Sequence, residues 1–219
     1  MNMKEYILNE IKALTLRSTV KNAQKVYKGF PITHIPIVED DHLIGCISES
    51  DFQTIEEKNS AITEYRDLID FFFAPDSVTI LDLIKLFADN DCNIMPVLSE
   101  EKAYPGYFEL NDILDLFTSS PFLYNQGVVI VVEKLTKDFS ISEISQIVES
   151  NGGTLLGLYV SSETSDNTQV TIKVNSDDIN EIIQTFRRYN YDIVSQYKDD
   201  FYLQDLKNRS DYLQKYLDM

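Results

Sequence analysis

The sequence is poor in the residues that most enzymes and metal sites use. Its 219 residues include two histidines, two cysteines and seven glycines, with no glycine-rich phosphate loop and no histidine-rich metal spacing. Cys46 and Cys92 lie in apolar runs without the short spacing of a metal or redox pair, which predicts buried thiols. The acidic pairs at 40–41 and 177–178 fall in a turn and at a helix start, where such pairs are solvated. We therefore expect no catalytic activity and no metal site.

The sequence also lacks positive charge and long apolar segments. Nineteen basic residues against thirty-six acidic ones give a net charge of −17, which repels nucleic-acid phosphates and anionic lipid. No segment approaches the roughly eighteen consecutive apolar residues of a membrane span. The opening residues 1–14 contain Glu5 and Glu10 and predict an amphipathic helix, not a signal peptide. We expect a cytoplasmic protein without nucleic-acid or membrane partners.

The first half of the sequence contains an internal repeat. Residues 31–52 (PITHIPIVEDDHLIGCISESDF) align with residues 91–113 (DCNIMPVLSEEKAYPGYFELNDI), which places Pro36 on Pro96 and Gly45 on Gly106. Before each segment, apolar residues three and four apart predict an amphipathic helix, at 20–27 and at 80–87. Each copy then continues as a strand, a polar loop, a second strand and a second helix. The unit helix, strand, strand, helix therefore occurs twice.

The motifs of the repeat resemble those of a tandem pair of CBS domains, a Bateman module. The strand pattern of an apolar residue, any residue, His or Arg, an apolar residue and Pro-Val or Pro-Ile occurs as ITHIPIV from Ile32. The pattern Gly-apolar-apolar-Ser-x-x-Asp occurs as GCISESD from Gly45. The resemblance covers about residues 1–120, and two copies in register are more specific than one short motif. It implies a pseudo-twofold pair whose clefts bind AMP, ATP or S-adenosylmethionine.

The resemblance also implies which residues bind the nucleotide. In such modules the serine or threonine contacts phosphate or ribose, and the aspartate binds the ribose hydroxyls. A carboxylate accepts both hydrogen bonds of a vicinal diol, and a helix N-terminus favours an anion. Two other interpretations stay open: His34 as a strand histidine at a sheet edge, and Ser48 with Asp51 as a helix N-cap. The implied nucleotide-binding residues are Thr33, His34, Ser48, Ser50 and Asp51, with Asp112 in the second copy.

The two copies differ at the implied site. The second copy reads GYFELND, so Glu109 replaces the serine while Asp112 persists, and Ile94 stands where the first copy has His34. A carboxylate about 4 Å from a phosphate costs several kcal/mol at an intermediate dielectric. We therefore expect a degenerate second site that binds an uncharged adenosine portion or nothing.

The second half predicts a different small domain. After a polar stretch at 118–127 marked by proline and glycine, strands are expected at 127–134, 154–163, 168–174 and 191–197, with helices at 140–151 and 176–190. The order is βαββαβ, a ferredoxin-like unit. In this position it resembles an ACT domain, and the chain resembles bacterial acetoin-utilisation regulatory proteins. ACT domains commonly bind amino acids at a glycine after the first strand, but here that loop, EKLTKDFS, has no glycine, which favours a structural or dimerising role.

The expected fold class is α/β (α+β): a tandem CBS domain pair followed by a ferredoxin-like, ACT-like domain. The expected boundaries are CBS domains at 1–60 and 61–120, a linker at 121–126, the ACT-like domain at 127–200 and a C-terminal helix at 201–219. The expected function is a non-catalytic, homodimeric sensor of AMP, ATP or S-adenosylmethionine, with or without Mg²⁺ and with no obligatory cofactor, acting on an unknown regulated protein. The alternatives are a constitutive dimeric scaffold with vestigial clefts, or amino-acid sensing by the ACT-like domain.

Overall fold

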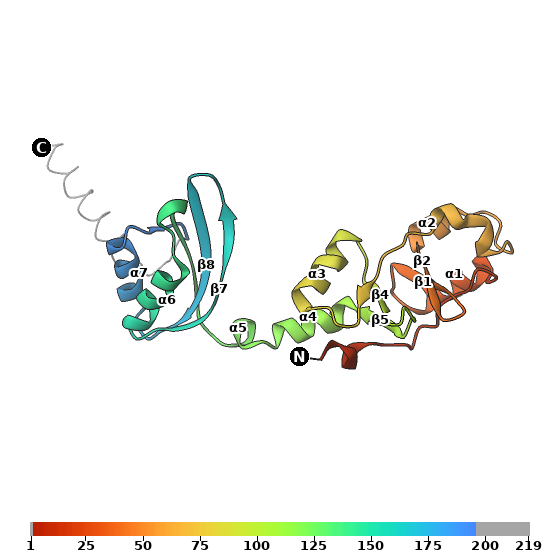
Figure 1. Cartoon of the computed structure of the whole chain (residues 1–219), viewed down its shortest axis with the longest axis horizontal. Coiled ribbons are helices and arrows are strands. Elements are labelled where there is room, and N and C mark those ends of the chain that lie inside the picture. Colours follow the sequence, from red (N-terminus) through yellow and green to blue (C-terminus); the bar gives the residue numbers. More distant parts are fainter. Residues whose placement is uncertain (1, 196–219) are drawn as a thin grey trace, which may run out of the picture. The chain divides into compact units, whose positions relative to one another are not determined.

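A computed structural model describes residues 2–195 of the protein. The chain divides into two compact units, Met1–Ser119 and Ser120–Met219, and each is described here by itself (Figure 1). The expected C-terminal helix at 201–219 lies outside the described residues. Within residues 2–195, no helix combines the length and the hydropathy that a membrane crossing requires.

The first unit contains the repeat that the sequence predicts. Both copies place an amphipathic helix before an antiparallel pair of strands, and each strand pair leads directly into a second helix. A two-residue strand, β3 (Ala74–Pro75), pairs parallel with β4. The first copy comprises α1 (Val20–Gly29), β1 (His34–Glu39), β2 (His42–Ser48) and α2 (Glu49–Thr54); the second comprises α3 (Ile80–Asp89), β4 (Ile94–Leu98), β5 (Gly106–Glu109) and α4 (Leu110–Thr118).

Equivalent threonines begin the first helix of each copy. The Thr19 side chain accepts a hydrogen bond from the backbone N–H of Asn22 at the start of α1, and Thr79 accepts one from Asp82 at the start of α3. Such caps satisfy backbone donors that have no partner within the helix. Both helices bury one apolar face against the strands, as the spacing predicts.

The opening residues do not form the helix that their pattern predicts. Within residues 2–14, only Met3–Tyr6 is helical, as a 3-10 turn. Leu8 pairs antiparallel with Tyr107, with N–H···O distances of 2.8 and 2.9 Å, and Leu14 pairs parallel with Ile37. The helix expectation was wrong because these backbone groups bond to strands distant in sequence, and the extended segment still contributes Leu14 to the core.

Each copy is completed by the segment that precedes the other copy. Cys46 of β2 pairs with Asp70, which lies before β3, and Tyr107 of β5 pairs with Leu8, which lies before α1. The residue that precedes each of these strand positions is a glycine with positive φ, Gly45 at 151° and Gly106 at 152°. A Cβ on Gly106 would lie 2.1 Å from the carbonyl oxygen of Leu8. The motif glycine therefore permits the exchange of segments between the copies.

The second unit is a four-stranded antiparallel sheet with helices on one face (Figure 1). The strand order β7-β8-β6-β9 is that of a ferredoxin-like βαββαβ unit, so the expected fold class is confirmed. Apolar residues of α6 and α7 pack with alternate residues of β6 and β8 to form the core. The elements are β6 (Val128–Leu135), the 3-10 turn η3 (Thr136–Asp138), α6 (Ile141–Ser150), β7 (Thr154–Glu163), β8 (Asn167–Asn175), α7 (Ile179–Arg188) and β9 (Asp192–Ile193).

The segment expected as a linker contains a short helix that packs on this sheet. Helix α5 (Pro121–Tyr124) places Phe122 against Gly157 of β7, where an added Cβ would lie 2.4 Å from the Phe122 ring. Lys173 of β8 donates from Nζ to the carbonyl oxygen of Leu123 at 3.0 Å. Residues 121–124 thus belong structurally to the second unit.

Candidate functional site

A pocket of about 420 Å³ in the first unit gathers the residues that the sequence predicts for the first copy. They come from the start of β1 and from the junction of β2 with α2, which are 15 residues apart in sequence but adjacent across the strand pair, where His34 faces Ser48. The pocket is lined by Thr33, His34, Ser48, Glu49, Ser50, Asp51, Asp70, Asn90 and Asp91. Asp112, from the second copy, does not line it.

Sequence reasoning missed four of the lining residues: Glu49, which lies between two predicted residues, and three residues from other segments. Asp70 lies in the segment that pairs with β2, and Asn90 and Asp91 follow α3 of the second copy. Asp91 has a left-handed φ of 46°, which turns the chain from the helix toward β4. The pseudo-twofold arrangement that the repeat implies could have identified them. In such a pair each cleft borders on the other copy, so the residues that follow α3 were candidates for the first cleft.

Ser48 caps helix α2 as the alternative interpretation expects. Its Oγ accepts the backbone N–H of Asp51 at 3.0 Å and donates to Asp51 Oδ2 at 2.6 Å, while Ser50 Oγ lies 2.8 Å away. The six-residue helix carries Glu49 and Asp51 in its first turn. Its positive N-terminal end is thus already compensated by carboxylates of the chain.

His34 is a buried histidine with one ring nitrogen free for a ligand. The residue is 8% exposed, its ring lies edge-on to Phe72 at 5.4 Å, and Nδ1 lies 2.9 Å from Thr33 Oγ1. This is the one hydrogen bond of the ring among residues 2–195, and Nε2 is not one of the buried polar atoms that lack a partner there. Burial lowers the pKa of His34 below its ordinary value near 6.5, against the opposing effect of the Asp70, Asp51 and Asp91 carboxylates. The imidazole is therefore neutral at pH 7.

Thr33 is fully engaged with Asn93, its equivalent in the second copy. Asn93 Oδ1 accepts from the Thr33 backbone N–H at 2.8 Å and from its hydroxyl at 3.1 Å, and Asn93 N–H donates to Thr33 Oγ1 at 3.0 Å. Asn93 Nδ2 also donates to the Pro31 carbonyl at 2.7 Å. Thr33, which lines the pocket, is therefore held by the second copy.

The pocket is strongly acidic. Glu49 and Asp51 are half-buried, and Asp70 and Asp91 are exposed at its rim. No lysine or arginine is among the lining residues. Four carboxylates around a neutral histidine create a local negative potential that solvent at the rim screens only in part.

The equivalent position in the second copy differs in burial and charge. Ile94 is fully buried where the first copy has His34, and Glu109 precedes α4 without a side-chain cap hydrogen bond. Burial raises the pKa of Glu109, and the neighbouring Asp112 and Glu10 carboxylates raise it further. The two copies thus differ in burial and charge at the position where the sequence predicts a degenerate second site.

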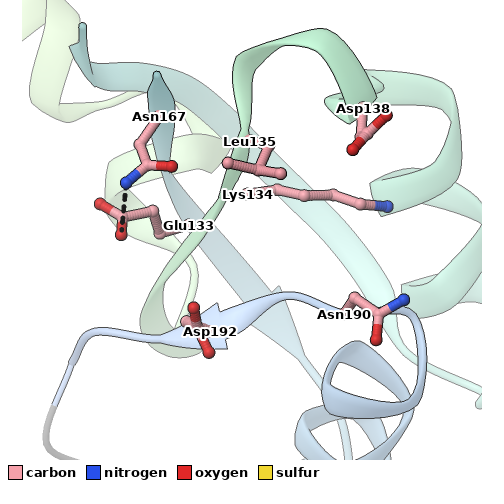
Figure 2. A pocket seen from close by; sticks show the side chains of 7 residues that line it. All are labelled: Glu133, Lys134, Leu135, Asp138, Asn167, Asn190 and Asp192. Carbon is pink, nitrogen blue, oxygen red and sulfur yellow. Dashed lines mark hydrogen bonds between the residues drawn. The ribbon is translucent and has the colours of Figure 1, made fainter.

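A second pocket, of about 390 Å³, lies in the second unit beside the loop after β6 (Figure 2). Asn167 Nδ2 donates to Glu133 Oε1 at 3.4 Å across one side of it. It is lined by Glu133, Lys134, Leu135, Asp138, Asn167, Asn190 and Asp192. The loop after β6, which contains no glycine, thus borders a polar pocket.

The ammonium group of Lys134 forms an ion pair within the second unit. Its Nζ pairs with Glu143 Oε2 at 2.5 Å and lies 4.4 Å from the centre of the Tyr191 ring. The hydrogen bond from Lys134 lowers the pKa of the Glu143 carboxyl. The carboxylates of Glu133, Asp138 and Asp192 therefore dominate the charge of this pocket.

One family model matches part of the chain. The model of the CBS domain matches residues 4–55, which contain the first copy of the repeat. The second copy has the same order of helices and strands.

Solved structures similar to the chain cover about half of it. A CBS domain pair/ACT domain protein from Thermotoga maritima is 18% identical, with a TM-score of 0.48 over 53% of this chain and 96% of that chain. CBSX2 in complex with AMP is 14% identical, with a TM-score of 0.45 over 53% of this chain and 95% of that one. The cytosolic domain of the Mg²⁺ channel MgtE in complex with ATP is 20% identical, with a TM-score of 0.43 over 51% and 46%.

Proposed function

We propose that the protein is a non-catalytic sensor that binds an adenosine-containing metabolite in the first cleft. The observation that carries the proposal is the pocket of about 420 Å³ that brings together Thr33, His34, Ser48, Ser50 and Asp51, residues assigned to one site from sequence motifs alone. The implied ligands are AMP, ATP and S-adenosylmethionine, with or without Mg²⁺.

Asp51 and His34 are the ligand-contacting residues in this proposal. Asp51 Oδ2 accepts from Ser48, which leaves Oδ1 for the hydroxyls of a ribose, and a carboxylate makes strong, charge-assisted bonds to a diol. His34 offers Nε2, the ring nitrogen without a partner among residues 2–195, to the base or the sugar. Ser48 and Thr33 hold these two residues in place through the hydrogen bonds described above.

Signalling requires a ligand that favours one of two arrangements of the protein. In this proposal the exchanged segments, Asp70 with Cys46 and Leu8 with Tyr107, carry the change, because a ligand that contacts Asp70 bears directly on the segment joining the copies. The receiver is the ACT-like ferredoxin-like unit, within a homodimer, or an unidentified regulated protein.

A ligand panel tests the proposal. Isothermal titration calorimetry and thermal shift of the full chain with adenosine, AMP, ATP and S-adenosylmethionine, with and without Mg²⁺, should give binding with at least one compound. Guanosine is the matched control, because it has the same ribose and charge as adenosine. If no adenosine compound binds under any condition, the cleft is vestigial and the dimeric scaffold becomes the better account.

The pocket of the second unit favours a second candidate function, amino-acid sensing. It borders the loop after β6, the position at which the ACT resemblance implies a ligand, and its amide and carboxylate groups suit an ammonium group. Binding of an amino acid that Asp192→Asn abolishes and Asp51→Ala leaves intact supports this second function.

A further inference from the structure

We propose that a small pocket between helices α1 and α2 is an anion site, which binds a phosphate group, either free or as the ester of a small metabolite. The pocket has a volume of about 240 Å³ and shares only Glu49 with the candidate cleft described above. Two lysines line it, Lys28 from α1 and Lys58 from the segment after α2. The proposal goes beyond the proposed function, because it requires no adenosine in the cleft.

The pocket lies beside a segment that is basic in an otherwise acidic chain. Residues 11–38 contain five basic residues and no acidic one, although the net charge of the chain is −17. Lys21, Lys25 and Lys28 lie four and three residues apart on α1, and all three are exposed. Like charges at these spacings repel each other along a helix. A bound anion would relieve that repulsion.

The start of α1 adds to the positive potential. Helices α3, α4, α6 and α7 each carry an acidic residue in the first turn, which compensates the positive end of the helix dipole. Helix α1 has no acidic residue there and carries Lys21 instead. The charge that is favourable at a helix start is therefore absent from the chain at α1.

Lys58 joins this basic surface from a distant segment. The backbone N–H of Lys21 donates to the carbonyl oxygen of Lys58 at 2.9 Å, which holds residue 58 beside the start of α1. Neither Lys28 nor Lys58 forms an ion pair within residues 2–195. Two ammonium groups from different segments thus line one pocket without an ion-pair partner. Lysine binds phosphate as a point charge with several donors.

The other lining groups suit a small phosphate ester. Gln24 contributes an amide, which has donors for phosphate oxygens. Glu49 is the one acidic residue in the lining, and its Oε1 accepts from Gln53 Nε2 at 3.3 Å, so two lysines outweigh one engaged carboxylate. The rings of Tyr27 and Phe52, with centroids 5.7 Å apart, supply apolar surface. The volume is below that of pockets for drug-sized ligands, which limits the ligand to a small molecule.

A titration of the full chain with small anions tests the proposal. Inorganic phosphate and glycerol 3-phosphate, at an ionic strength held constant with sodium chloride, should give saturable binding by ³¹P NMR and should raise the unfolding temperature. Succinate, measured by thermal shift, should bind about fivefold more weakly because its two charges are separated, and glycerol should not bind. Tighter binding of glycerol 3-phosphate indicates an esterified ligand, and the reverse order indicates free phosphate.

Substitutions locate the binding in the pocket. Lys28→Gln and Lys58→Gln should each weaken phosphate about fivefold, and Glu49→Gln should strengthen it about threefold, because it removes the opposing charge. Lys137→Gln, which replaces an exposed lysine of the second unit, changes the net charge equally and should have no effect. Thermal unfolding without ligand establishes that all four variants are folded.

The outcomes separate this site from the adenosine site. If no phosphate compound binds, or if Lys28→Gln and Lys58→Gln bind phosphate as Lys137→Gln does, the proposal is overturned. Succinate that binds as tightly as phosphate overturns the assignment to phosphate. Adenosine carries no phosphate, so its binding, which should depend on Asp51 and not on Lys28, reports on the proposed function alone.

Discussion

Thr33 and Asn93, equivalent residues of the two copies, hydrogen-bond each other reciprocally. The Asn93 side chain accepts from the Thr33 N–H at 2.8 Å, and the Thr33 hydroxyl accepts from the Asn93 N–H at 3.0 Å. The contact joins the two copies of the repeat and includes Thr33, which lines the candidate cleft. It links the integrity of the cleft to the pairing of the copies.

A double-mutant cycle measures this link. Thr33→Val and Asn93→Ala should each destabilise the first unit, and the pair should show a coupling free energy of about 1 kcal/mol, because each removes the partner of the other. Urea unfolding of the two single variants and the double variant measures the coupling free energy. Thr63→Val, an exposed threonine, is the control and should change stability little; purely additive losses would contradict a direct coupling.

The motif glycines should resist substitution more than other glycines. Gly45→Ala and Gly106→Ala should each cost about 2–4 kcal/mol, because both need a positive φ and an added Cβ meets the Asp70 or the Leu8 carbonyl. Gly29→Ala is the control, since nothing lies within 4 Å of its added Cβ. Thermal unfolding measures the loss of stability in each variant. Equal losses in all three would contradict the role of these two glycines in the exchange of segments.

His34 should make the stability of the first unit depend on pH. Its folded pKa is lowered by burial, so below about pH 6.5 the unfolded chain binds a proton that the folded chain does not, and stability falls as the pH falls. His34→Gln should flatten this slope between about pH 7.5 and 5.5, as measured by urea midpoints. His42→Gln, which replaces the other histidine of the chain, should keep it.

Phe122 and Gly157 should behave as one packing unit. Gly157→Ala should destabilise the second unit by about 1–2 kcal/mol, because its Cβ would lie 2.4 Å from the Phe122 ring. The double variant Gly157→Ala/Phe122→Ala should be less destabilised than the sum of the two single variants, since the new methyl group then has space. Thermal unfolding compares the three, and strict additivity would mean that α5 does not pack as described.

The repeat and the ferredoxin-like order could be read from the sequence because their signals are local. Helices such as α1 and α3 have an apolar stripe and a threonine cap within one segment, and the aligned glycines and aspartates fix the register between copies. The five first-copy residues met in one pocket because they lie at the ends of two paired strands. Such features need no knowledge of distant contacts.

The remaining features depend on contacts between distant segments. Leu8 and Leu14 have helical spacing but pair with strands 99 and 23 residues away, at Tyr107 and Ile37. Asp70 and Asp91 reach the cleft through the exchange of segments and the left-handed turn after α3. Local periodicity carries no information about either, so the acidity of the cleft emerges only in three dimensions.

The most direct test of the account compares Asp51→Ala with Asp112→Ala in calorimetric titration of the full chain with adenosine. Thermal unfolding first establishes that both variants are folded. The account predicts one binding site per chain, abolished by Asp51→Ala and unchanged within about twofold by Asp112→Ala, because the first copy combines a free carboxylate oxygen with His34 in a pocket, whereas Ile94 replaces the histidine in the second copy. Equal losses in the two variants, or undiminished binding in Asp51→Ala, would contradict it.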